Sequence, residues 1–151
     1  SNAMDAEQRL AKIIASGDEC DRATVEELYD RLAPVPVDFM LGTWRGGIFD
    51  RGDALAGMLL GMNWYGKRFI DRDHVEPLLC RSPDGSIYSY EKLGLARLRE
   101  VALRGTVSAA MIYDKQPIID HFRRVNDDMV VGAMDAKGQP DILYFHLTRE
   151  R

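Results

Sequence analysis

Residues 40–47 read Met-Leu-Gly-Thr-Trp-Arg-Gly-Gly, and this stretch decides our prediction of the fold. We interpret it as the opening strand of a small antiparallel β-barrel, because glycine permits the close strand approach that a curved sheet needs. From Val37 onward the chain consists of short β-type runs separated by glycine and turn residues. Strand signals at a spacing of about 8–12 residues predict an antiparallel meander, and closing it into a barrel removes exposed sheet edges.

The other expected strands follow in order along the chain. Turn residues separate them, as at Pro83-Asp84-Gly85 and at residues 126–128. The segment 97–113 is long enough for two strands with a bend at Gly105. The remaining expected strands are 64–71, 75–81, 87–91, 117–125, 129–136 and 142–149.

Helices are expected before the barrel and once within it. Residues 5–15 and 24–32 each place apolar side chains at helical spacing, and Thr24 with Glu27 forms a capping-box pattern. This helical pair could pack across a barrel mouth or against a partner subunit. A short helix is expected over 53–60 with Asp53 as its N-cap, and its apolar residues are interpreted as core or lid.

We predict one structural domain. Residues 1–3 resemble a remnant of tag removal and are set aside, residues 4–36 form the N-terminal helical segment, and residues 37–151 form the barrel. Hydrophobic content of 46% and charged content of 29% are typical of a globular protein.

Composition also excludes several partner classes. The formal net charge of −4 gives no reason to expect nucleic acid, and no apolar run is long enough to span a membrane. Cys20 and Cys80 lack metal-ligand spacing and are expected to be reduced thiols in a cytoplasmic protein. A homodimer is the default assembly.

The pentapeptide at residues 42–46, Gly-Thr-Trp-Arg-Gly, resembles the signature of the GXWXG family. The chain from about residue 28 to residue 149 also resembles that family with its companion, domain of unknown function 4334, in bacterial and fungal proteins. The supporting stretches are 37–41, 64–69, 75–79, 111–114, 117–125 and 132–138. The family's name assigns no biochemistry, so the resemblance implies a fold and carries over no catalytic residue.

The Gly-X-Trp start is also similar to that of lipocalins and nitrobindin-like barrels. It implies a mainly β, lipocalin-like (calycin-type) antiparallel barrel of about eight strands with N-terminal helices. In such barrels a basic residue of the last strand covers the tryptophan ring, which contributes roughly 1 kcal/mol. Alternation places Arg149 on the face that carries the apolar residues of 143–147, so we expect it to cover Trp44. The residues expected to be structural are Gly42, Trp44, Gly46 and Arg149.

The strand 117–125 carries ionisable groups on both of its faces. Alternation places Ile118, Asp120, Phe122 and Arg124 on one face and Ile119, His121, Arg123 and Val125 on the other. One interpretation is that His121, with Asp114 or Asp120 nearby, lines the cavity as a ligand anchor, haem ligand or general base. Tyr113 and Arg123 are further ligand-binding candidates. The alternative is that Asp120 forms structural ion pairs with Arg123 or Arg124 and that His121 is a partly exposed strand residue.

The segment 64–69 is a second candidate. Strand alternation would turn Tyr65, Lys67 and Phe69 to one face and Trp64, Arg68 and Ile70 to the other. Tyr65 and Lys67, or else Arg68, could bind an anionic group such as a carboxylate. The alternative is an outward Lys67 whose stem lies on the sheet.

Three hypotheses about function follow, together with a structural alternative. The first is a binding protein that holds a small hydrophobic molecule, with or without an acidic group, in the barrel. The second is an enzyme with His121 and an aspartate as its acid–base pair, and the third is haem binding. The alternative is an oligomerising module that uses the N-terminal helices. No cofactor other than that haem alternative is expected, and His74, His121 and His146 lack the spacing of a metal site.

Overall fold

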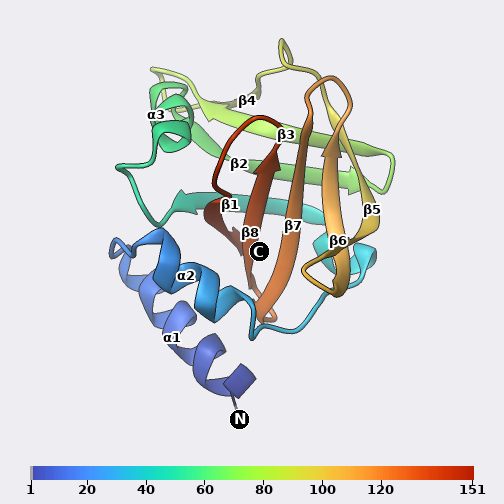
Figure 1. Cartoon of the computed structure of the whole chain (residues 1–151). Helices are drawn as coiled ribbons and strands as arrows, with labels where there is room; N and C mark the ends of the chain where they lie inside the picture. Colours follow the sequence, from blue (N-terminus) through green and yellow to red (C-terminus); the bar gives the residue numbers. More distant parts are fainter. Residues whose placement is uncertain (1) are drawn as a thin grey trace.

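Eight antiparallel strands close into a barrel in the computed structural model, which describes residues 2–151 (Figure 1). The strands are β1 (Gly42–Ile48), β2 (Trp64–Asp71), β3 (His74–Arg81), β4 (Ile87–Ser89), β5 (Ala96–Leu103), β6 (Thr106–Tyr113), β7 (Ile118–Asn126), β8 (Met129–Ala136) and β9 (Leu143–Arg149). The hydrogen-bonded order is β2-β1-β9-β8-β7-β6-β5-β3, and pairing of β2 with β3 closes the ring. The short β4 adds to β3 outside the ring. The predicted fold class is confirmed.

The helices are α1 (Asn2–Ser16), α2 (Arg22–Tyr29) and α3 (Ala54–Gly61), and a 3-10 turn, η1 (Val37–Met40), precedes β1. Since α1 begins at Asn2, two of the residues set aside as a tag remnant belong to this helix.

Two helix N-caps contrast with each other. Asp21, not Thr24, caps α2, because the Asp21 carboxylate accepts a hydrogen bond from the Thr24 backbone N–H at 2.9 Å. The predicted capping box at Thr24 is therefore wrong. The predicted cap of α3 is correct, since Asp53 accepts from the Leu55 backbone N–H at 2.8 Å.

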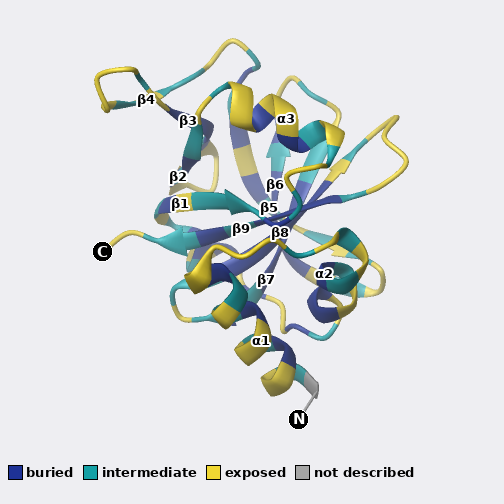
Figure 2. Cartoon of the chain, turned by 90° about the vertical axis from the view of Figure 1, so that its left-hand side faces the viewer, coloured by how far each residue is buried: buried dark blue, intermediate teal, exposed yellow. Residues whose placement is uncertain are grey.

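Helices α1 and α2 pack against the outer wall of the barrel and not across its mouth. Figure 2 shows both helices buried on one side and exposed on the other. The outer core that they share with β7, β8 and β9 includes Leu10, Val25, Leu28, Tyr29, Val125, Val131, Ala133 and Tyr144. Because apolar residues stand on the outer faces of these strands as well as inside, the outer wall itself needs a cover.

The two ends of the barrel are closed differently. Strand β9 begins beside α3, since residues 139–141 and the start of α3 line one small pocket. It ends at Arg149, whose side chain donates to the carbonyl oxygens of Phe39 (2.9 Å) and Leu41 (3.2 Å) at η1. Therefore α3 covers one mouth, and η1 covers the other.

Trp44 fills the end of the barrel that η1 covers. It pairs in register with Arg149, whose guanidinium carbon lies 4.3 Å from the centroid of the indole ring. The indole N–H donates to the Met40 carbonyl oxygen at 2.8 Å, and the side chain is fully buried. The structure thus brings together the tryptophan and the arginine that the sequence pattern paired.

Glycines allow the strands around Trp44 to approach closely. Gly42 has φ +120°, which side-chain-bearing residues rarely adopt. A Cβ atom added at Gly46 would overlap the indole of Trp64, and one added at Gly66 would overlap the carbonyl oxygen of Trp44. In the Gly-X-Trp-X-Gly motif, the first glycine, Gly42, is therefore needed for its backbone conformation. The last glycine, Gly46, is needed because its missing side chain leaves room for the Trp64 indole.

A β-bulge changes which residues of β2 face inward. Trp64 pairs with Cys80 but Gly66 pairs with Leu79, so β2 has one extra residue, Tyr65, relative to β3. Because of this bulge, Trp64 faces the barrel interior, as Lys67 does, and Tyr65 faces outward.

Candidate functional site

Among the described residues, one buried ion pair joins opposite walls of the barrel interior. Lys67 on β2 and Asp120 on β7 lie four strands apart in either direction around the ring of eight. Their Nζ and Oδ2 atoms are 3.2 Å apart, and the side chains are 3% and 1% exposed. The other inward residues of these strands, such as Phe69 and Phe122, are apolar and pack ring against ring.

Aromatic rings and backbone surround the Lys67 ammonium. Nζ donates to the Pro77 carbonyl oxygen at 3.1 Å and lies 5.3–5.7 Å from the ring centroids of Phe145, Trp64 and Tyr113. Burial lowers the pKa of Lys67, against the opposing effect of the Asp120 charge.

Asp120 has one carboxylate oxygen without a partner. Oδ2 faces Lys67, but Oδ1 is buried and forms no hydrogen bond with any described residue. Burial raises the pKa of Asp120, and burial together with the Asp120 charge raises the pKa of Tyr113. An unpaired buried acceptor is costly, so it marks a place where a ligand donor group would be favourable.

An apolar cavity of about 170 Å³ lies under α3. Its lining includes Leu59, Met62, Leu78, Tyr113, Ile118 and Met134. Ile118 precedes Asp120 by two residues on the inner face of β7, and Met134 is the register partner of Asp120 on β8. The ion pair therefore occupies the layer of inward side chains next to the cavity, and the Tyr113 ring contributes to both.

His121 lies outside the barrel, so its predicted place in the cavity is wrong. It follows the inward Asp120 and is 3% exposed on the outer face of β7, where α1 packs. Neither ring nitrogen has a hydrogen-bond partner among the described residues, and the nearest carboxylate oxygen, on Asp135, is 3.9 Å from Nε2. Burial lowers the pKa of His121. None of the three histidines faces the interior, so none is placed to bind a haem there.

Arg123 also faces outward, where it holds the end of α2. Its guanidinium donates to the carbonyl oxygens of Leu32 (3.0 Å) and Tyr29 (3.4 Å) and lies 4.7 Å from the Tyr29 ring centroid. Positive charge at a helix C-terminus is stabilising. The structure thus gives Arg123 a position in the outer wall and not in the cavity.

Two more predicted site residues lie outside the barrel interior. Asp114 is exposed beyond the end of β6. Arg68 faces outward and pairs with Glu76 at 2.6 Å. Neither lines the interior cavity, and the Arg68 charge already has a partner.

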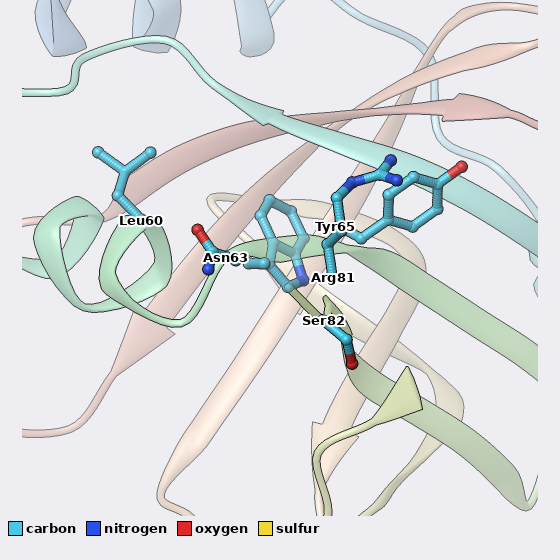
Figure 3. A pocket seen from close by; sticks show the side chains of 6 residues that line it. Leu60, Asn63, Tyr65, Arg81 and Ser82 are labelled. Carbon is cyan, nitrogen blue, oxygen red and sulfur yellow. The ribbon is translucent and has the colours of Figure 1, made fainter. Parts of the chain in front are cut away.

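Tyr65 belongs to a shallow surface pocket instead of the interior. Its hydroxyl donates to the Glu150 carboxylate, and its ring centroid lies 5.1 Å from the Arg81 guanidinium carbon. Figure 3 shows Tyr65 and Arg81 side by side in this pocket, with Asn63 and Ser82. The expected pairing of Tyr65 with Lys67 is therefore wrong, because the bulge separates them.

His146 is a second histidine of the outer wall, where it is partly buried. Its ring centroid lies 4.8 Å from that of Phe49, and a Cβ atom added at Gly47 would overlap the imidazole. Burial, with a smaller effect of Arg45, lowers the pKa of His146 to about 4. The folded protein therefore holds this imidazole neutral.

Acidification should destabilise the protein through His146. Because the folded pKa is lower than the unfolded value of 6.5, the stabilisation is complete above pH 6.5 and is lost as the pH falls toward 4. We expect a loss of about 1–2 kcal/mol between pH 7 and pH 5, measured by urea unfolding at both values. His146→Phe should reduce this difference, whereas His74→Gln, at an exposed histidine, should not. An equal pH dependence in all three proteins would contradict the assignment.

Sequence reasoning named Lys67, Tyr113 and Asp120 but did not bring Lys67 together with Asp120. It missed Leu78, Leu93, Gln116 and Met134 as cavity residues. For Leu78 and Met134 the sequence shows only that each lies in a β-type run, and Leu93 and Gln116 lie in connections between strands.

The comparisons agree with the resemblance seen in the sequence. The GXWXG protein family matches residues 27–85, and the domain of unknown function DUF4334 matches residues 94–149. No curated protein matches the chain. Among the described residues, no helix combines the length and the apolar character that crossing a bilayer requires.

Proposed function

Because the chain contains the GXWXG and DUF4334 family segments, whose descriptions name no activity, we propose a function from the geometry of the barrel. The protein binds a small, largely apolar molecule in the cavity under α3. The observation that carries this proposal is an apolar cavity next to a buried polar pair with an unpaired acceptor. Ligand sites typically combine an apolar lining with a few polar groups that fix orientation.

The charge balance favours a ligand with a neutral polar end over an acid. The Lys67 charge is matched by Asp120, so an incoming carboxylate would meet a group of its own sign. Asp120 Oδ1 accepts hydrogen bonds, which suits a hydroxyl or an N–H group. The proposed ligand is therefore a neutral amphipathic molecule.

We also propose that the protein works in the cytoplasm, because its free cysteines would remain reduced there.

Hexan-1-ol should stabilise the protein more than hexanoic acid does. At a concentration about tenfold above Kd, binding contributes about 1.4 kcal/mol, or a rise in Tm of roughly 3–6 °C. Differential scanning fluorimetry measures this shift. Leu59→Trp fills the cavity from α3 and should abolish it, whereas Leu60→Trp, at an exposed position on the same helix, should retain it.

A wild-type protein whose Tm does not respond to hexan-1-ol would contradict the proposal. An equal shift in the Leu59→Trp protein would contradict the location, because the alcohol would then bind elsewhere.

A further inference from the structure

A gain in folding stability does not explain why the Lys67–Asp120 pair lies inside the barrel. Burying two charges has a desolvation cost that their attraction often does not exceed, and apolar residues of similar size are commonly as stabilising. The surrounding interior is apolar, and Pro77 supplies only a backbone acceptor to Nζ. A primary amine that is shielded from water beside a cavity is the arrangement that makes a lysine nucleophilic, because desolvation opposes its positive charge.

We propose that Lys67 captures a small aliphatic aldehyde or ketone from this cavity as an imine, with Asp120 moving the protons. This inference rests on the proposed function and assigns its ligand a chemical class. The carbonyl carbon would be held between the cavity and Nζ, and the alkyl chain would lie under α3.

The uncharged forms of both groups are the reactive ones. Burial lowers the pKa of Lys67 and raises that of Asp120, so moving a proton from the Lys67 ammonium to the Asp120 carboxylate costs less here than it would in water, and this transfer gives the free amine and the carboxylic acid. The 3.2 Å separation of Nζ and Oδ2 allows direct proton transfer between them.

The steps balance without a further reactant. The Nζ lone pair attacks the carbonyl carbon, a C–N bond forms, and the carbonyl oxygen takes the Asp120 proton. The Asp120 carboxylate then removes a proton from nitrogen, which gives a neutral carbinolamine and restores the acid. Asp120 next protonates the departing hydroxyl, water leaves, and the nitrogen lone pair forms the C=N bond. The product is a protonated imine paired with the Asp120 carboxylate.

The site suits the charge of this product. The imine nitrogen remains within reach of the Asp120 carboxylate, and the Trp64, Tyr113 and Phe145 rings surround a delocalised cation. Water released in the last step would leave through the cavity under α3. The same groups thus serve as proton carrier and as counter-ion.

Reductive trapping with hexanal and sodium cyanoborohydride at pH 7 tests the proposal. The hydride converts an imine to a stable hexyl-lysine, which intact mass and peptide mapping locate. We expect Lys67 to be labelled at least about tenfold faster than an exposed lysine such as Lys92, because the cavity would hold the aldehyde beside Nζ, which converts a bimolecular step into an intramolecular one. Lys67→Met should remove the fast labelling, and Lys92→Met should not. Asp120→Asn, with folding checked by circular dichroism, should slow it.

Hexan-1-ol separates the two proposals. If it stabilises the protein but hexanal labels Lys67 no faster than Lys92, imine capture is wrong and binding stands. If neither the alcohol nor the aldehyde acts on the wild-type protein, both proposals are wrong. Fast labelling of Lys67 that is blocked by Leu59→Trp and retained in Leu60→Trp supports both.

Discussion

Asp120→Leu is expected to destabilise the protein by about 3–5 kcal/mol, because it leaves the Lys67 amine buried among aromatic rings without a counter-charge. The double variant Lys67→Met/Asp120→Leu should recover most of this loss, since it replaces the pair with apolar side chains. Urea unfolding of both variants and the wild type measures the free energies. The double variant should also lose fast labelling by hexanal while remaining folded.

Asp73→Ala is the matched control for the buried pair. It removes an exposed ion pair with Arg99, at 2.8 Å, and should change stability by less than about 1 kcal/mol. If Asp120→Leu proves no more harmful than Asp73→Ala, the interior pair is not the desolvated contact described above.

Gly66→Ala is expected to destabilise the protein by at least about 3 kcal/mol or to prevent folding. The added methyl group would overlap the Trp44 carbonyl oxygen on the neighbouring strand, and a backbone atom cannot move aside as a side chain can. Separation of β1 from β2 would open the barrel beside Trp44. The yield of folded protein and its urea midpoint measure the effect.

Gly57→Ala provides the contrast on α3, where an added Cβ atom meets nothing within 4 Å. It should stabilise the protein by up to about 1 kcal/mol, because alanine favours the helix more than glycine does. Similar stability of the two variants would contradict the close approach at Gly66.

The barrel could be predicted from the sequence because strand runs, turn residues and the Gly-X-Trp start all agree. The face of β7 could not be chosen from its residues. His121 and Arg123 are buried as fully as Asp120, since α1 and α2 cover the outer wall. Where both sides of a strand are buried, alternation no longer separates inside from outside.

The candidate site was only partly predictable for two further reasons. The extra residue at Tyr65 shifts the alternation in β2, and such a bulge leaves no reliable mark in composition. The contact between Lys67 and Asp120 depends on how eight strands close, which places residues far apart in the chain across one interior. Periodicity describes one strand at a time and does not contain that information.

The pairing of Trp44 with Arg149 has a consequence for the order of assembly. Strand β1 joins β2, which follows it closely, but its other edge joins β9, about a hundred residues later in the chain. During synthesis the motif strand therefore has one unpaired edge until β9 leaves the ribosome. The Trp44 indole likewise has no guanidinium to cover it until then. The signature that begins the barrel is completed by its last strand, so closure is a late and non-local event in folding.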